Sequence, residues 1–480
     1  MIPTFIGLFI ILAGAVLLFV GSVPAMFSMV MLCSLMGGSA ALLLPALGGS
    51  SIPPTQFALV FMFARLLLPG SGQGAIVLDA LRRNVLLMGF VLWGVAIAML
   101  GPRIFAGAMQ VVPLRMTSAR GSAETIALGF SAQNITSAVY LIGTFLIAVA
   151  ATAACMNHDG VRRFVRMGLV IAWMHIVLGV LGLALSGTIF EDVLALFRNG
   201  NYAQTEQVLE NFSRIQGIAP EPSVYASFGF AWFVFLFECW LREIHPRRTG
   251  TAAAAMAAVL LFSTSSTAYL GLGAYGALLL IRSLLIPQPM AFRKVLVLGM
   301  AGIGVAVVVT AILLLRPGLV AAFTDMIQMM TVGKTGSDSA VERALWARQG
   351  LDAFRVSFGL GVGPGSFRSS SFLTAMLGST GVLGAALFAA YLAHMFKPLR
   401  ASTYARSADV ANDIGAAASW TALAVLIPAS VISPSTDPGS EFAIFAGVAL
   451  ALRWSKARAS MSPSAPARRL PLQEELSHAR

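Results

Sequence analysis

The chain is organised around residues 358–384, which read FGLGVGPGSFRSSSFLTAMLGSTGVLG. Glycine occupies every second position from 359 to 365, where it lets the backbone turn sharply and bring its N–H groups close to a bound group. Residues 369–371 are serines that can cap the apolar helix that follows. Unpaired N–H groups and a helix N-terminus beside Arg368 favour an anion such as a phosphate. The alternative is a plain flexible turn between a surface segment and a membrane helix.

Composition excludes an ordinary soluble protein. Of the 480 residues, 58% are apolar and 11% are charged, and the mean hydropathy is +0.83. A water-soluble fold cannot bury so much apolar surface, so the sequence predicts an all-α, polytopic membrane protein. The net charge of +12 comes mainly from short loops and from a basic tail at 455–480, which is predicted to be disordered. A basic membrane protein needs no nucleic-acid partner to explain its charge.

Apolar stretches predict about thirteen spans in an integral membrane domain of residues 1–454. Ten stretches are long enough to cross the membrane as helices, near 2–20, 24–47, 85–101, 136–154, 164–187, 223–241, 295–315, 372–396, 413–432 and 438–453. Three shorter stretches are also expected to span, at 55–68, 251–263 and 268–286. The first stretch has no basic residues before it, so it is expected to be a retained helix and not a cleaved signal peptide.

Three cysteines, Cys33, Cys155 and Cys239, lie in or at the ends of apolar segments. Their odd number and wide spacing predict neither a disulfide framework nor a zinc cluster. They are expected to be small buried side chains.

Arginine and lysine recur on every second connection, which predicts that these connections face the cytoplasm. The opposite, outer side then receives three longer connections, 102–135, 188–222 and 317–371. These connections and their edges contain ten arginines and one lysine. Because the arginine fork grips phosphate or carboxylate through two bonds, we predict an anionic ligand at the outer membrane face. The alternative is pairing with acidic residues of the same connections.

Two polar segments of the chain are candidate binding segments. Apolar residues at helical spacing in 202–214 predict an amphipathic helix on the membrane surface, which leaves Arg214 and Glu221 at the interface. A salt bridge between these two residues is the alternative to a ligand site. The hydroxyls of residues 263–267, Ser265 among them, either satisfy backbone groups or bind sugar hydroxyls, and we favour the structural role.

A further helix is predicted near Ser339. Ser339 followed three residues later by Glu342 matches a capping box. We therefore interpret Glu342 as a helix-capping residue in preference to a catalytic one. Arg343 then lies in the first turn, where a cation gains nothing from the helix dipole. Ligand binding is the other reason for an arginine at that position.

Three of these stretches together resemble the O-antigen polymerase and ligase superfamily of bacterial envelopes. The family pattern has an Arg-x-x-Gly segment before a span, a Thr/Ser-rich pair of short helices, and an Arg-x-x-x-Trp helix before a Gly-x-Gly-x-Gly loop. Its counterparts in this chain are Arg214 with Gly217, residues 263–267, Arg343 with Trp346 at a shorter spacing of three, and Gly361 to Phe367. The resemblance covers residues 200–400. Asn134-Ile-Thr-Ser is similar, more weakly, to the exopolysaccharide polymerase branch.

The chain departs from the family pattern in two places. Ligases of the family usually place His-Asn soon after the glycine loop, where this chain has Ser369 and Ser370, and none of its five histidines falls in an outer connection. That departure disfavours a ligase and leaves no histidine base on the outer side. Thr267 stands where many relatives carry arginine.

The resemblance implies a GT-C-like glycosyltransferase of the bacterial inner membrane whose active site faces the periplasm. It implies that an acceptor sugar hydroxyl attacks the donor's anomeric carbon with inversion and expels polyprenyl pyrophosphate. Arg214, Arg343 and Arg368 would stabilise the leaving group without metal or cofactor, and Glu221 is a candidate general base. Further substrate-binding candidates are Arg120, Asn134, Ser265, Gly363, Gly365, Ser366 and Ser369. Besides the lipid-linked oligosaccharide, the expected partners are membrane lipid and a chain-length regulator.

Two rivals to a polymerase remain open. One is a ligase that passes the glycan to another acceptor, and the other is a flippase for lipid-linked oligosaccharide. The flippase is disfavoured because, apart from His175, the middle of the predicted spans has almost no acids or bases to couple ions, and because the chain shows no obvious internal repeat.

Overall fold

The computed structural model describes residues 2–45, 50–68, 72–114, 125–200, 208–209, 212–213, 215–285, 338–397 and 410–452, with short helical pieces between 294 and 311. Arg120, Arg214 and the tail at 455–480 lie outside the described residues, so the structure does not bear on the predictions made for them.

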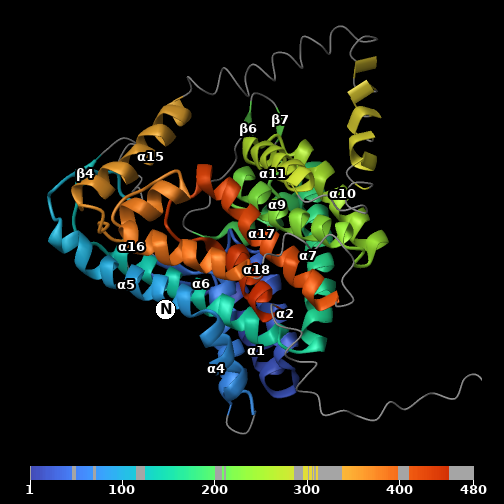
Figure 1. Ribbon diagram of the computed structural model, residues 1–480, viewed down its shortest axis with the longest axis horizontal. Helices are drawn as coiled ribbons and strands as arrows, with labels where there is room; N and C mark the ends of the chain where they lie inside the picture. Colours follow the sequence, from blue (N-terminus) through green and yellow to red (C-terminus); the bar gives the residue numbers. More distant parts are fainter. Residues whose placement is uncertain are drawn as a thin grey trace, which may run out of the picture.

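The described chain is mostly helical, as predicted (Figure 1). Seven helices are long and apolar enough to cross a membrane: α5 (Val85–Ile104), α6 (Ala132–Cys155), α7 (His158–Ala184), α9 (Pro222–Leu241), α11 (Ser266–Leu285), α16 (Phe372–Met395) and α17 (Val410–Ile432). Shorter apolar helices also fall on predicted spans: α1 (Phe5–Val20), α2 (Val23–Ser34), α3 (Pro54–Leu67) and α18 (Gly439–Ala451). The span predicted at 24–47 is helical only as far as Ser34, and strand β2 occupies 42–44. These features are those of a multi-pass membrane protein. The total of about thirteen spans and the GT-C-like fold stay predictions.

Other elements complete the described chain. The remaining helices are α4 (Gly74–Arg83), α8 (Ile189–Ala195), the 3-10 helix η2 (Leu196–Arg198), α10 (Pro246–Phe262) and α15 (Asp338–Val356). Three small antiparallel sheets add to the predicted all-α class: β1 (Ile2–Pro3) with β2 (Leu42–Leu44) and β3 (Ser50–Ile52), β4 (Gln110–Val111) with β5 (Ile126–Ala127), and β6 (Val208–Leu209) with β7 (Phe212–Ser213).

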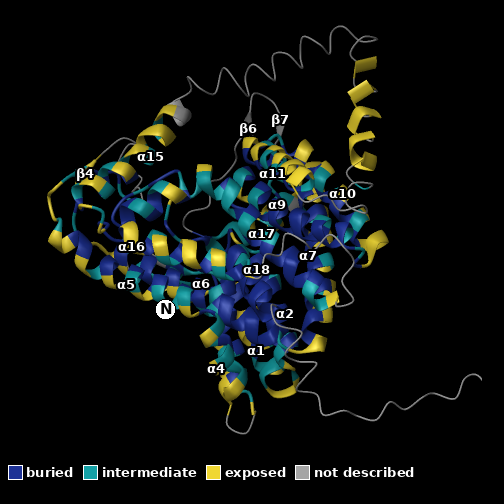
Figure 2. Ribbon diagram, viewed as in Figure 1, coloured by how far each residue is buried: buried dark blue, intermediate teal, exposed yellow. Residues whose placement is uncertain are grey.

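Helices α6 and α9 lie at the centre of the bundle. In the most apolar window of each, 78% of the residues are buried, against 22% in α11 and 33% in α7. Figure 2 shows the buried residues gathered around α9, α18 and α2, while exposed residues lie on the outer helices. Because a helix that is apolar all round must be enclosed by protein or lipid, the exposed apolar faces of α1, α7 and α11 are where lipid is expected.

Small residues and aromatic rings hold the centre together. A Cβ atom added at Gly447 on α18 would overlap the carbonyl oxygen of Ala148 on α6, so these two backbones are in direct contact. Beside them, the Trp232 ring of α9 lies 4.9 Å from the Phe445 ring of α18, centroid to centroid. Such contacts fix the positions of α6, α9 and α18, whose ends border the site described below.

Helix α16 is broken at Gly381, which has a φ of 65° and lies in a helix that otherwise continues to Met395. The break frees carbonyl groups, and the residues between α15 and α16, here called the glycine loop (residues 357–371), bond to them. Val362 N donates to Gly378 O at 2.9 Å, and Gly363 N donates to Ser379 O at 3.0 Å. Trp93 Nε1 of α5 donates to Thr380 O at 2.7 Å, and Val382 N, just after the break, donates to Gly359 O of the loop at 2.8 Å. The break is therefore paired within the protein, as backbone at membrane depth must be.

These hydrogen bonds give the glycines of the loop a structural role in close backbone packing. Side chains at 361 or 363 would collide with backbone: a Cβ atom at Gly363 would lie 2.6 Å from the Ile97 carbonyl oxygen of α5, and Gly361 faces Ser379 of α16. Gly361 N donates to Ser357 Oγ at 2.9 Å, and Gly363 N is used by α16. The predicted cradle of unpaired N–H groups is thus wrong at these two residues, because their N–H groups are already bonded inside the protein.

We expect Gly381→Ala to destabilise the protein strongly. Alanine at a φ of 65° is strained, and its Cβ atom would overlap the carbonyl oxygen of Gly359. The expected cost is at least ~2 kcal/mol, since strain and overlap add. Thermal unfolding of the purified protein in detergent measures it, with Gly276→Ala on α11, where a Cβ atom meets open space, as the control. Equal melting temperatures for the two variants would contradict the pairing described here.

Two local predictions need correction. Residues 208–209 and 212–213 form a hairpin and not the predicted amphipathic helix over 202–214. Apolar residues in so short a segment match a strand pair as well as a helix, and valine and phenylalanine favour strands. Helix α15 already includes Asp338, so Ser339 lies inside it and is not its N-cap. Ser371 does occupy the N-cap position of α16, but its side chain makes no capping bond.

A buried charged cluster lies at the C-terminal ends of α9 and α11, and so away from the middle of the spans, to which the prediction of few acids and bases refers. Glu238 on α9 pairs with Arg242 one turn later and with Arg282 of α11, whose Nη2 lies 2.8 Å from Glu238 Oε1. Tyr275 Oη donates to the same oxygen at 2.6 Å. The three charged side chains are at most 3% exposed. The cluster escaped prediction because Arg242 and Arg282 were counted with basic connections and Glu238 was not singled out.

Candidate functional site

The glycine loop joins the ends of several helices that are distant in sequence. Arg368 N donates to Val112 O at 2.9 Å, and Ser369 N donates to Pro434 O, in the connection between α17 and α18, at 3.0 Å. Asn134 Nδ2, in the first turn of α6, donates to Pro364 O at 2.9 Å. One end of the bundle therefore carries the glycine loop, the start of α6 and the turn before α18 as neighbours.

Arg368 lies half-buried in this region. Its guanidinium carbon stands 4.5 Å from the centre of the Trp346 ring on α15, a cation–π contact. Its Nη1 donates to Leu114 O at 3.4 Å, while its Nε is buried and has no hydrogen-bond partner among the described residues. The cation is thus held by an aromatic face and one long hydrogen bond, and its donors are not all used.

The charge on Arg368 is poorly solvated. Burial lowers the pKa of its guanidinium, and the Glu221 and Glu342 carboxylates act in the opposite direction. Since arginine stays protonated in proteins, the effect of burial is to make this cation favour an anion that completes its pairing.

Glu221 lies at the N-terminus of α9, at the N-cap position. Its Oε2 accepts a hydrogen bond from Ser223 Oγ at 3.0 Å. The structure thus brings two predicted residues, Glu221 and Arg368, into one electrostatic environment, although they are separated by nearly 150 positions in the sequence.

Arg343 lies on α15, and its side chain is exposed. Its backbone carbonyl accepts a hydrogen bond from Ser370 Oγ at 2.5 Å, which holds α15 against the glycine loop. This bond places the backbone of Arg343 beside the loop that carries Arg368, and the role of the Arg343 side chain in binding stays a prediction.

Ser369 and Ser265 are both buried, at 1% exposure each. Ser369 Oγ is 3.0 Å from Thr374 Oγ1 and lies in the turn that starts α16. Ser265 lies in the turn between α10 and α11, where its carbonyl accepts from Tyr269 N at 3.2 Å. Among the described residues, no hydrogen bond joins Ser265 to the glycine loop.

Asn134 clamps the glycine loop onto α6. It completes a capping box with Ser131 at the start of α6, and Nδ2 also donates to Ser366 Oγ at 2.9 Å. Gly365 makes the approach possible, because a Cβ atom there would overlap the carbonyl oxygen of Gln133. The structure brings the predicted residues Asn134, Gly365 and Ser366 together, and the polar atoms of the Asn134 amide are used in this clamp.

We expect Asn134→Ala to lower stability by ~1–3 kcal/mol, because it leaves buried acceptors and the Ser131 amide without their partner. Thermal unfolding measures the change. Val139→Ala, at an exposed position on the same helix α6, is the control. Unchanged stability with weaker binding of substrate would instead support the predicted substrate-binding role of Asn134.

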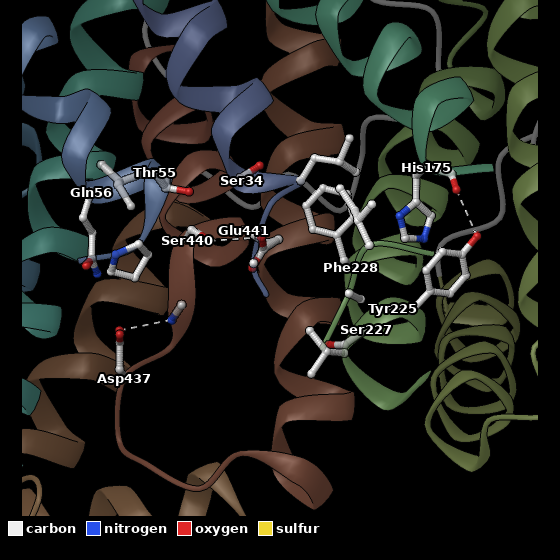
Figure 3. Close-up of a pocket in the computed structure, with 18 of the residues that line it drawn as sticks. Ser34, Thr55, Gln56, His175, Tyr225, Ser227, Phe228, Asp437, Ser440 and Glu441 are labelled. Carbon is white, nitrogen blue, oxygen red and sulfur yellow. Dashed lines mark hydrogen bonds between the residues drawn. The ribbon is translucent and has the colours of Figure 1, made fainter. Parts of the chain in front are cut away.

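A cavity of about 320 Å³ opens beside this region, between α3, α6, α7, α9 and α18. Figure 3 shows its two walls: the carboxylates of Asp437 and Glu441 lie on one side with Gln56, and the rings of Tyr225 and Phe228 lie on the other. Its volume lies at the lower end of the range for small-molecule sites, which is roughly 300–1,000 Å³.

Asp437 stands in the turn between α17 and α18. Its Oδ1 accepts hydrogen bonds from Thr144 Oγ1 at 2.7 Å and from Gly439 N at 3.2 Å. Oδ2 accepts none from the described residues. Burial raises the pKa of Asp437 to about 6, against the lowering effect of those two hydrogen bonds.

The cavity and Arg368 share two segments of chain. The turn at 433–438 carries Asp437 and accepts the hydrogen bond from Ser369 N. The segment at 218–228 lines the cavity, and it includes Glu221, whose charge acts on Arg368. The cation and the cavity therefore border one region of the fold.

Sequence reasoning missed Asp437 and Glu441. The available signal is an acidic pair, four residues apart, at the start of a predicted span, since ionisable groups at membrane depth mark functional sites. The prediction instead concentrated on arginines in the three long outer connections, and the turn at 433–438 is not one of them.

Among the described residues, no three His, Cys, Asp or Glu side chains are grouped so as to hold a metal ion. Comparison with protein-family models and with curated proteins finds no match for the chain. The function is therefore argued from the geometry of Arg368 and the cavity, beside the motifs quoted above.

Proposed function

We propose that the chain is a membrane glycosyltransferase that joins polyprenyl-pyrophosphate-linked repeat units into a polysaccharide. Its reaction takes place at the periplasmic face of the bacterial inner membrane. The observation that supports it is the environment of Arg368: a half-buried cation with an unused buried donor, on a loop that is hydrogen-bonded to the turn carrying Asp437, which lines a cavity of sugar-binding size.

The reaction needs a group that stabilises the charge left on pyrophosphate. As the anomeric C–O bond breaks, its electron pair moves to the leaving oxygen, and a preorganised cation in a poorly solvated place lowers the energy of that state. Arg368 fits the requirement because it is partly withdrawn from water and its guanidinium lies against the Trp346 ring. The exposed Arg343 on α15 is the second candidate for the same anion.

A flippase is the second candidate function, because the buried cluster of Glu238, Arg242 and Arg282 places charged groups inside the protein near the ends of two apolar helices. Against it, these charges pair with one another and with Tyr275. A group that couples transport to an ion must be able to release its partner.

The experiment is a transfer reaction with the purified protein in lipid. The polyprenyl-pyrophosphate-linked repeat unit is supplied, and lipid-linked products are resolved by length. A ladder of oligomers supports the polymerase. Transfer of a single chain to an added acceptor, without a ladder, would indicate a ligase, and the absence of any transfer with the authentic repeat unit would overturn the proposal and favour a flippase.

A further inference from the structure

The cavity has the surface of a sugar site. Polar groups that can bind hydroxyls lie together on one wall: Gln56 on α3, Thr144 on α6, and Asp437, Ser440 and Glu441 at the start of α18. The opposite wall carries the rings of Tyr225 and Phe228 of α9, with His175 and Ser227 beside them (Figure 3). A sugar ring presents hydroxyls at its edge and C–H groups on its face, so it matches a cavity with polar groups on one wall and aromatic rings on the other.

Asp437 has one oxygen fixed and one unused. Thr144 and Gly439 orient the carboxylate by binding Oδ1, and Oδ2 lines a cavity without a partner among the described residues. Glu441 differs, because Ser440 Oγ, from the adjacent residue, donates to its Oε1 and no distant element holds it. Asp437 is therefore the better positioned acceptor for a hydroxyl proton.

We propose that this cavity binds the acceptor sugar and that Asp437 is the base that takes the proton from the attacking hydroxyl. The inference rests on the proposed transferase function, and it assigns the base that the sequence left to Glu221. Glu221 is less suited because its carboxylate interacts electrostatically with the cation of Arg368. Among the described residues, no arginine or lysine lines the cavity that contains Asp437.

The step balances in atoms and charge. The hydroxyl proton passes to Asp437 Oδ2 as the hydroxyl oxygen bonds to the anomeric carbon of the donor. The bond from that carbon to the pyrophosphate oxygen breaks, and its electron pair leaves with pyrophosphate beside Arg368. Inversion requires the base and the leaving group on opposite faces of the anomeric carbon. In this proposal Asp437, on the turn at 433–438, and Arg368, on the glycine loop, would act from these two faces, and the hydrogen bond from Ser369 N to Pro434 O joins the two segments.

The titration of Asp437 gives the reaction a predicted pH dependence. A base must be deprotonated to act, so the turnover number rises with pH through about 6, where the pKa of Asp437 lies, and levels off above it. The other titratable groups that face the cavity are Tyr140 on α6, His175 on α7, Tyr225 on α9 and Glu441 on α18.

The test compares Asp437→Asn with wild type in the transfer reaction, across pH 5 to 8. We expect the turnover number of Asp437→Asn to fall by ~100-fold or more and its acid limb near pH 6 to disappear, with donor binding kept. Asp352→Asn, an exposed aspartate on α15, is the control and should behave as wild type. Thermal unfolding identifies any variant that fails to fold.

A second variant tests the assignment without removing the carboxylate. Thr144→Val deletes the hydrogen bond that lowers the pKa of Asp437, so the acid limb should move to higher pH. If wild type transfers and Asp437→Asn keeps its rate and its acid limb, the base assignment is overturned while the transferase function stands. If wild type itself transfers nothing, the transferase function fails and the assignment fails with it.

Discussion

Arg368→Ala should lower the turnover number of sugar transfer by ~100-fold or more, since it removes a preorganised cation from a poorly solvated site at the leaving group. The turnover number of Arg368→Lys should lie between those of Arg368→Ala and wild type. Lysine keeps the charge but neither presents a planar fork nor stacks as well on Trp346. The length-resolved transfer reaction measures both variants, and the Michaelis constant separates loss of binding from loss of turnover.

The matched control for Arg368 is Arg355→Ala. Arg355 lies on α15, its side chain is 70% exposed, and it pairs with Asp352 at 3.0 Å. A surface substitution of this kind changes stability or rate only slightly, within about twofold in rate. Equal activities for Arg368→Ala and Arg355→Ala would show that leaving-group stabilisation comes from elsewhere, with Arg343 as the next residue to test.

Glu238→Gln should destabilise the protein by ~3–5 kcal/mol, because it removes the negative charge from a cluster with two buried arginines. Unfolding in denaturant or by heat, in the same detergent, measures the loss. The double variant Glu238→Gln with Arg282→Gln should recover part of it, since the double change restores charge balance.

The control for Glu238 is Asp79→Asn. Asp79 pairs with Arg83 at the same i, i+4 spacing as Glu238 with Arg242, but its side chain is 43% exposed. An exposed pair contributes ~0–1 kcal/mol. If Glu238→Gln and Asp79→Asn lower the free energy of unfolding equally, then burial does not strengthen the ion pairs of Glu238, and the cluster does not stabilise the protein.

Much of the fold was predictable because membrane spans need only length and apolar composition. The seven long apolar helices fall on predicted stretches, and the shorter α1, α2, α3 and α18 do so as well. The glycine loop was also found, since four glycines in seven residues are conspicuous in any sequence. Its role was predicted only in part, because whether an N–H group is free or bonded depends on neighbours that lie far along the chain.

The amino-acid sequence by itself determined the class of protein, the helical spans, and the presence of arginine and glycine between α15 and α16. These properties follow from composition and from local backbone geometry. The tertiary structure alone decided that the glycine loop bonds into the break at Gly381, that Glu221 acts on Arg368, and that Asp437 lines a cavity. Each of these facts depends on the packing of distant helices, which brings together groups that no spacing along the chain relates.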